Sequence, residues 1–300
     1  MYSSKIGRAL RTGTTAAACV AATVLPCSTS QAEPVSGTPQ TYVALGDSFS
    51  AGVGISPLAP VSGLPSVCGR SSVNYPHLLA EQLGVATFRD VTCGSATSAD
   101  LAGRQSDLVG SREPQFDALS PDTTLVTLGI GGNDIGLIEL GAGCVNPLPE
   151  PVGSSCADRF TVDGHDRIGA RIEAFAPTYG LIIDQIRARS PQARIVMVGY
   201  PVGIRLDGCP GVQPTWAADA NYLQSKIDQL NTVMAAQAAV NNVDFVGLAA
   251  STAGHDACAE PGQNWITGIV PQSIESPVPM HPNAAGHRNA AQQLLTTLTR

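Results

Sequence analysis

Asp47 and Ser48 stand where a short apolar run meets a glycine turn. Residues 41–54 read TYVALGDSFSAGVG, and the first five of them suit a buried strand. Parallel α/β sheets keep their ligand crevice at the carboxyl ends of the strands, so a serine here is a candidate nucleophile. The alternative is an Asp-Ser helix cap, because both residue types are common at helix N-termini. A nucleophile also requires a base and a site for the oxyanion.

His281 is the candidate base among the five histidines of the chain. It precedes Pro282, which cannot sit inside a helix, and Asn283, an expected N-cap. The imidazole would therefore lie outside the final helix and face the sheet edge. Neutral imidazole can take the proton of Ser48 and return it to a leaving alcohol, so activity is expected to rise as the pH passes about 6 to 7. Three other histidines are expected at the surface: His77, His165 and His255.

Three N–H donors could stabilise an oxyanion near Ser48. They are the backbone N–H groups of Ser48 and Gly94 and the side-chain amide of Asn133, each of which follows a predicted strand. Loss of one such donor typically lowers turnover by about 100- to 1000-fold. Asn133 lies in the loop GIGGND, so it is equally well explained as a turn residue.

Other chemistries lack their motifs. The residue two after Ser48 is Ser50, so there is no Gly-x-Ser-x-Gly elbow, and there is no P-loop. Residues 129–134 resemble a dinucleotide-binding loop, but Asp134 replaces its last glycine and would repel a pyrophosphate. No cysteine or histidine cluster has zinc-ligand spacing. We therefore expect no metal and no cofactor.

Residues 1–32 are expected to be a secretory signal peptide, because a basic start precedes a small, apolar stretch and a small-residue cleavage site. Residues 33–300 are expected to form one domain, with no membrane anchor, since no later apolar run approaches the roughly 18 residues of a span. Without Lys5, Arg8 and Arg11 the chain has 14 basic and 24 acidic residues, a net charge of about −10. This charge disfavours nucleic-acid binding.

Six of the eight cysteines lie beyond the expected signal peptide. An even number in an exported chain indicates disulfides. Pairing of nearest neighbours would close only short or moderate loops, although six cysteines allow many other pairings. The six are Cys68, Cys93, Cys144, Cys156, Cys209 and Cys258.

Strands and helices alternate along the chain. Pro177 should kink or divide the long helix in which it lies. The alternation predicts a parallel sheet covered by helices on both faces, with Ser48, Gly94, Asn133 and His281 at one edge. The expected strands are 41–45, 86–91, 122–128, 194–198 and 243–246, the expected helices 75–83, 166–189, 217–240 and 283–298, and the expected loops 52–71, 144–163, 200–214 and 249–282.

Four short blocks of this sequence resemble, in order and spacing, those of the SGNH hydrolases, also called the GDSL esterase/lipase family. The blocks are Gly46-Asp47-Ser48, Gly94, Gly131-Gly132-Asn133-Asp134, and His281-Pro282 through Gly286-His287. The resemblance covers residues 41–298 and implies a flavodoxin-like, three-layer α/β/α sandwich with a five-stranded parallel sheet. It also implies that Ser48 is the nucleophile and His281 the base, with Ser48, Gly94 and Asn133 as the oxyanion hole. The cysteines resemble those of secreted actinobacterial lipases and phospholipases, which implies the sequential pairing 68–93, 144–156 and 209–258.

Two positions depart from the family pattern. Phe49 stands where the family name has leucine, and little consequence is expected. The family places an aspartate three residues before the histidine, where this chain has Val278. Some secreted members use a backbone carbonyl instead, so we expect a Ser48–His281 dyad in which the ring N–H donates to the Val278 carbonyl. Glu275 is the alternative orienting group.

The expected substrate is a carboxylic ester with an acyl chain, and the resemblance implies a secreted lipase, esterase or phospholipase A-type enzyme that acts as a monomer. The alternatives are removal of acetyl groups from a polysaccharide and a non-catalytic binding protein on a degenerate hydrolase scaffold. Apolar loop residues could line an acyl groove or simply cover the core. These residues are Ile55, Leu58, Leu64, Ile204, Trp216, Trp265 and Ile269.

Overall fold

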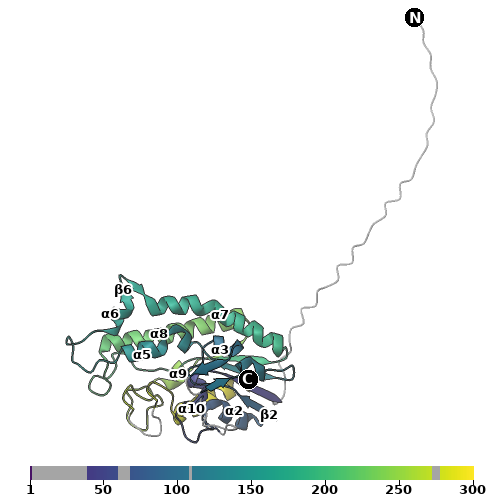
Figure 1. The fold of residues 1–300 in the computed structure, drawn as a ribbon, viewed down its shortest axis with the longest axis horizontal. Coiled ribbons are helices and arrows are strands. Elements are labelled where there is room, and N and C mark those ends of the chain that lie inside the picture. Colours follow the sequence, from purple (N-terminus) through teal and green to yellow (C-terminus); the bar gives the residue numbers. More distant parts are fainter. Residues whose placement is uncertain (2–38, 60–67, 108–109, 272–277) are drawn as a thin grey trace. The chain divides into compact units, whose positions relative to one another are not determined.

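Five parallel strands form the central sheet (Figure 1). The computed structural model describes Met1 and residues 39–59, 68–107, 110–271 and 278–300, so the expected signal peptide lies outside the described residues. The all-parallel sheet in an α/β chain confirms the fold class expected from the sequence. The strands are β1 (Thr41–Gly46), β2 (Thr87–Asp90), β5 (Leu125–Gly129), β8 (Arg194–Val198) and β9 (Asp244–Val246), in the order β2-β1-β5-β8-β9.

The chain reverses its direction across the sheet after β2. Strand β2 lies on one side of β1, whereas β5 and the later strands lie on the other. In an open parallel sheet, such a reversal opens a crevice at the carboxyl ends of the strands. Gly46 pairs with Gly129, so β1 and β5 end level and the turns that follow them begin side by side.

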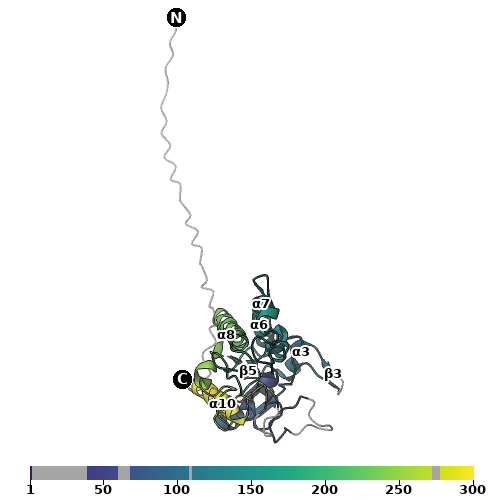
Figure 2. The same cartoon turned by 90° about the vertical axis from the view of Figure 1, so that its left-hand side faces the viewer.

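Alternate residues of each strand point to opposite faces of the sheet. In β1, Val43 and Leu45 join a core with α7 and α8, whereas Tyr42 and Ala44 join a core with α2 and α10. Figure 2 shows α7 and α8 on one side of β5 and α10 on the other. The sheet is therefore buried on both faces, as expected of parallel strands. The bounds are α2 (Tyr75–Leu83), α7 (Arg167–Arg189), α8 (Ala217–Val240) and α10 (Ala284–Leu298).

These four helices agree with the sequence expectation to within one residue at each end. Asn283 caps α10, since its side chain accepts hydrogen bonds from Ala285 N and Gly286 N at 2.9 and 3.2 Å. Of the two expected effects of Pro177, a kink or a division, the division does not occur, because α7 is one helix through that residue. Pro177 lies on the exposed face, where water can hydrate the carbonyl that loses its helical partner, while the buried face continues unbroken.

Short elements that the sequence did not indicate lie in the connections. One-turn helices follow β1 and β5, and two small antiparallel hairpins add to the long connections between the sheet strands. They are α1 (Ser48–Ala51), α3 (Ala99–Ala102), β3 (Gln105–Asp107), β4 (Gly110–Arg112), the 3-10 helix η1 (Gln115–Ala118), α4 (Gly132–Ile135), α5 (Leu137–Gly143), α6 (Cys156–Phe160), β6 (Thr161–Val162), β7 (His165–Asp166) and α9 (Ala249–Thr252).

Three disulfides staple the loops at the carboxyl edge of the sheet. They join Cys68 to Cys93, Cys144 to Cys156 and Cys209 to Cys258, the sequential pairing implied by the family resemblance. In the part of the chain that the structure describes, no helix combines the length and the apolar character needed to cross a bilayer.

The disulfides should differ in their effect on stability. The Cys209–Cys258 bridge spans a sequence separation of 49 residues and the Cys144–Cys156 bridge one of 12. A longer closed loop restricts the unfolded chain more, so Cys209→Ser/Cys258→Ser should lower the free energy of unfolding by about 4 kcal/mol and Cys144→Ser/Cys156→Ser by about 3 kcal/mol. Urea denaturation measures both values. The reverse order would contradict the loop-entropy explanation.

Candidate active site

Ser48 and His281 meet at the carboxyl edge of the sheet although they are far apart in the sequence. His281 Nε2 lies 2.7 Å from Ser48 Oγ. Ser48 begins the one-turn helix α1 directly after β1, and His281 precedes α10. The two side chains are only 8% and 6% exposed, so little water competes for this hydrogen bond.

A backbone carbonyl orients the imidazole, but it belongs to Pro279. His281 Nδ1 lies 2.8 Å from Pro279 O. The expectation of Val278 is therefore wrong by one residue, because the turn at residues 278–280 directs the later carbonyl at the ring. A carbonyl can only accept, so Nδ1 carries the proton and the lone pair of Nε2 faces the Ser48 hydroxyl. Glu275, the alternative orienting group, lies outside the described residues.

The backbone on either side of His281 is held by the segment around Thr267. Thr267 N donates to His281 O and Met280 N donates to Thr267 O, both at 2.9 Å. Met280 has a φ of 60°, a conformation that a residue with a side chain rarely adopts. This local strain is offset by the paired backbone bonds and turns the following residue toward Ser48.

Burial lowers the pKa of His281, and the Pro279 carbonyl opposes this shift by stabilising the ring N–H. The aromatic ring of Phe49 packs against the imidazole with a centroid separation of 4.7 Å. Phe49 thus supplies part of the apolar environment that disfavours imidazolium. The residue that departs from the family name is in direct contact with the candidate base.

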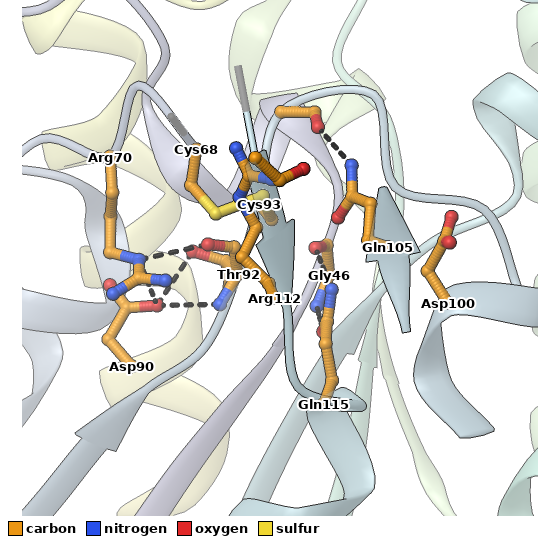
Figure 3. Close-up of a disulfide and its surroundings, with 12 residues drawn as sticks. Gly46, Cys68, Arg70, Asp90, Thr92, Cys93, Asp100, Gln105, Arg112 and Gln115 are labelled. Carbon is orange, nitrogen blue, oxygen red and sulfur yellow. Dashed lines mark hydrogen bonds and ion pairs between the residues drawn. A yellow bond between two sulfur atoms is a disulfide. The ribbon is translucent and has the colours of Figure 1, made fainter. Parts of the chain in front are cut away.

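The turn that carries Ser48 is held to its neighbours by its backbone. Asp47 N donates to Gly129 O at 2.9 Å, which extends the β1–β5 ladder by one residue. A Cβ on Gly46 would come within 2.5 Å of Gly129 O, so only glycine permits this approach. The side chain of Gln115 donates to Gly46 O and accepts from Gly46 N, at 3.0 and 2.8 Å (Figure 3). No pattern in the sequence pointed to Gln115.

Asp47 is buried and connects three strand ends. Its Oδ1 accepts from Phe49 N at 2.9 Å, and its Oδ2 accepts from the hydroxyl of Tyr200 at 2.6 Å. The same hydroxyl accepts from Gly132 N at 2.7 Å. Tyr200 therefore links the turn after β1 to the loop after β5. Burial raises the pKa of Asp47 to about 7, and the hydrogen bonds from Tyr200 and Phe49 oppose the shift.

Two of the three expected oxyanion donors retain a free N–H. Ser48 N has no acceptor among the described residues. Asn133 Nδ2 donates one hydrogen to Ala96 O at 2.8 Å, and the second hydrogen of this amide stays available. Asp134 accepts from Ser98 N and from Ser98 Oγ, at 3.0 and 2.6 Å, which joins the loop after β5 to the loop after β2.

Gly94 differs from the expectation. Its N–H donates to Cys68 O at 3.0 Å, because the Cys68–Cys93 disulfide brings that carbonyl next to it. Ser95 has a left-handed backbone with a φ of 62°, and its N–H has no acceptor within the described part of the chain. Ser95 N therefore replaces Gly94 N as the candidate donor from this loop. Sequence reasoning missed it because glycine is the usual residue for this conformation.

The same disulfide holds the wall of the site beside this loop (Figure 3). Arg70 follows Cys68 and donates to Thr92 O at 2.9 Å, and its guanidinium lies 3.5 Å from Asp90. These contacts link the segment that follows Cys68 to the end of β2 and to the residues between β2 and Cys93. The loop that carries Gly94 and Ser95 is thus tied by a covalent bond and by part-buried polar contacts.

An apolar cavity of about 350 Å³ adjoins His281. Its lining comes mainly from helices α5 and α8 and from the segments near residues 200, 266 and 279. The lining residues include Phe49, Leu137, Ile138, Gly141, Val145, Tyr200, Leu223, Ile227, Ile266, Ile269, Met280 and His281.

Only Ile269 of the seven residues expected to form an acyl groove lines this cavity. Ile55 and Ile204 are buried in the core, and Leu58 is 48% exposed. Trp216 lines a separate cleft, Trp265 stacks on His255, and Leu64 lies outside the described residues. The expectation considered loops alone, whereas helices α5 and α8 also supply part of the wall. The apolar residues of the segment LIELGAG were the signal that could have indicated α5.

Residues 44–288 match the GDSL-like Lipase/Acylhydrolase family. The chain belongs to this family. It is 38% identical over 299 residues to a protein named Lipase 2 of Streptomyces coelicolor, covering 97% of each chain. Its structure is similar to the crystal structures of an extracellular lipase from Streptomyces rimosus (TM-score 0.65, 27% identity) and of phospholipase A1 from Streptomyces albidoflavus (TM-score 0.66, 28% identity). Each structural match covers 86% of this chain and 99% of the other.

Among the described residues, no group of three or more His, Cys, Asp and Glu side chains is arranged to hold a metal ion. The arrangement at Ser48 can activate a hydroxyl, protonate a leaving group and donate N–H groups to an oxyanion, which are the requirements of acyl transfer.

The acid limb of the pH–rate profile should lie below the pH 6 to 7 expected from an ordinary histidine. His281 acts as a base only when neutral, and burial lowers its pKa. The neutral form therefore predominates at neutral pH, and the midpoint of the fall in kcat/KM should lie below about 6.5. Hydrolysis of a soluble ester between about pH 4 and 8 tests this. Circular dichroism at each pH separates loss of activity from unfolding, and a midpoint at or above about 6.5 would contradict the prediction.

Tyr200→Phe should lower kcat about tenfold with little change in KM. The variant leaves Asp47 Oδ2 and Gly132 N without their shared hydroxyl, so the nucleophile turn and the oxyanion loop lose their common anchor. Tyr179→Phe is the matched control, because it removes another buried hydroxyl, which donates to Ile130 O at 2.9 Å and does not touch Asp47. Steady-state kinetics should show the fall in kcat for Tyr200→Phe alone, whereas urea denaturation should show a similar loss of about 1 to 3 kcal/mol in both variants. Equal kcat values in the two variants would leave Tyr200 with a purely structural role.

Proposed function

We propose that this chain is an exported serine ester hydrolase that cleaves aliphatic acyl esters through an acyl-enzyme. The observation that carries the proposal is the apolar cavity of about 350 Å³ directly beside the Ser48–His281 pair. Family membership supports ester hydrolysis, and the cavity supports an acyl chain as the part of the substrate that is bound. The names of the Streptomyces relatives, lipase and phospholipase A1, agree with this substrate class.

The proposed reaction uses Ser48 as nucleophile and His281 as base. The imidazole takes the hydroxyl proton while Oγ attacks the ester carbonyl, and it returns the proton to the leaving alcohol as the acyl-enzyme forms. Water then repeats these steps and releases the fatty acid. Ser48 N, Ser95 N and Asn133 Nδ2 are the proposed donors to the oxyanion. The Pro279 carbonyl orients the ring but stabilises imidazolium less than a carboxylate would.

The lining of the cavity favours an aliphatic chain over a sugar. Among the described residues that line it, the titratable side chains are those of His281 and Tyr200, and the hydroxyl of Tyr200 is already bound to Asp47. Burial of each methylene of a chain in such a cavity contributes about 0.8 kcal/mol. A polysaccharide would find few polar partners there. The cavity therefore supports an acyl ester hydrolase over the alternative of O-deacetylation.

Export and a monomeric state are part of the proposal. Three disulfides favour an oxidising compartment, and residues 1–32 have the composition of a signal peptide. One chain contributes every group assigned to the reaction, so a single copy suffices.

The experiment that tests the proposal compares esters of increasing acyl length on wild type, Gly141→Phe, Gly141→Ala and Ser48→Ala. Gly141 lines the cavity, and a Cβ added there meets no atom within 4 Å, so a larger side chain at this position starts in open space. Gly141→Phe should lower kcat/KM for a long-chain p-nitrophenyl ester about tenfold, the equivalent of about two buried methylenes, and leave the acetate within about twofold. Gly141→Ala should behave as wild type, and Ser48→Ala should hydrolyse none of the esters.

Other outcomes would favour the alternatives. Highest activity on acetate, unaffected by Gly141→Phe, would favour a deacetylase. Hydrolysis retained by Ser48→Ala would remove the serine mechanism. A folded wild type without activity on any ester would favour a binding protein.

A further inference from the structure

Several large apolar side chains are exposed to solvent at one end of the folded domain. They lie on α5, on the loop between α5 and α6, on the loop before α8 and on the loop after α9. Figure 1 shows α5 and α6 together at one end of the fold, away from the end where α7 finishes. Their exposed fractions lie between 43% and 58%. We call these side chains the apolar rim: Ile138, Val145, Leu148, Val152, Val212 and Val270.

We propose that the apolar rim docks on the surface of a lipid aggregate whose headgroups carry no net charge. Contiguous exposed apolar side chains mark interaction surfaces, because isolated ones would give little gain in burial. The proposal concerns binding to the aggregate. It rests on the proposed function only in its purpose, which is to deliver an ester from the aggregate to Ser48.

The rim is continuous with the acyl cavity. Ile138 and Val145 belong to both, since they line the cavity and are exposed. Val270 follows Ile269, which also lines the cavity. A second cleft of about 560 Å³ lies beyond, lined by Leu148, Val212 and Val270 among others. An acyl chain leaving an aggregate could therefore reach His281 over an apolar surface.

The loops that carry the rim are held in place. The Cys144–Cys156 disulfide encloses Leu148 and Val152, and the Cys209–Cys258 disulfide encloses Val212. The two loops are also joined to each other. Trp216 Nε1 donates to Leu148 O at 2.7 Å, Asn146 N to Pro214 O at 2.6 Å, and Val270 N to Gln213 Oε1 at 3.0 Å. Because these side chains are already positioned, docking would order little additional chain.

The charges at this surface favour an uncharged or zwitterionic partner. No lysine or arginine is among the described residues that line either the cavity or the cleft, and Glu150 lines the cleft. The whole chain has a net charge of −7. Anionic lipids attract basic segments, and the lining of these two hollows offers none. Binding should therefore depend on apolar contact, and it should be insensitive to salt.

The test uses sedimentation with phosphatidylcholine vesicles. All proteins carry Ser48→Ala, so that hydrolysis does not alter the lipid. Leu148→Asp/Val270→Asp should weaken vesicle binding at least about tenfold, because two apolar contacts are replaced by carboxylates that resist dehydration. Leu181→Asp/Val240→Asp is the matched control. It exchanges the same residue types and adds the same charge at sites that are 67% and 79% exposed on α7 and α8, outside the rim.

The outcomes separate the proposal from its alternatives. Loss of binding in the rim variant, with the control unchanged, supports it. Absence of binding to phosphatidylcholine by the protein that carries Ser48→Ala alone, or an equal loss of binding in the control, overturns it. Stronger binding to phosphatidylglycerol vesicles that salt abolishes would also overturn it. Circular dichroism and the milder Leu148→Ser/Val270→Ser variant exclude unfolding as the cause.

An activity measurement on proteins that keep Ser48 distinguishes this proposal from the proposed function. Leu148→Asp/Val270→Asp should leave hydrolysis of soluble p-nitrophenyl butyrate unchanged and reduce hydrolysis of an emulsified long-chain ester about tenfold. An equal fall on both substrates would overturn the docking role. If wild type hydrolyses neither ester, the proposed function fails. The vesicle-binding experiment still tests by itself whether the apolar rim docks on lipid.

Discussion

The close contact between the ends of β1 and β5 is the constraint on which the candidate site depends. Gly46 and Gly129 stand opposite each other, and the ladder continues with a bond from Asp47 N to Gly129 O. A side chain on Gly46 would clash with that carbonyl. Because Gly46 and Gly129 have no side chains, the ends of β1 and β5 can approach each other closely. The turn that carries Ser48 and the loop that carries Asn133 therefore begin side by side. Neither segment has to move to bring the two side chains together.

A buried carboxylate stabilises this junction. Asp47 receives hydrogen bonds from the backbone of its own turn and from Tyr200, which also binds the loop after β5. Burial of a charge is unfavourable, and it raises the pKa of Asp47 to about 7. The aspartate of the Gly-Asp-Ser block therefore acts here on the shape of the site, since His281 has its own orienting carbonyl at Pro279. The hydrogen bonds that hold Asp47 also hold the peptide that precedes Asn133.

The outer parts of the fold add specificity to this centre. Helices α5 and α8 supply an apolar wall beside His281, and the disulfide-bridged loops extend that wall to the surface. The polar chemistry and the apolar binding surface thus come from different layers. The sheet edge provides short turns that carry the polar groups. The helices provide apolar side chains, which can be replaced by larger or smaller ones without changing those turns.

The sequence by itself determined the sheet, the four long helices, the family and the identity of the pair Ser48 and His281 as candidates. Strand alternation, helix period and capping residues are local properties, so β1 and α10 could be predicted from their own residues. Only the tertiary structure decided which neighbouring groups complete the site. The choice of Pro279 over Val278 depends on the direction of a turn, and the use of the Gly94 N–H by Cys68 depends on a disulfide between separate segments. The apolar cavity likewise arises between α5, α8 and the loops beside His281, because a cavity is a property of packed surfaces and leaves no pattern in any one segment.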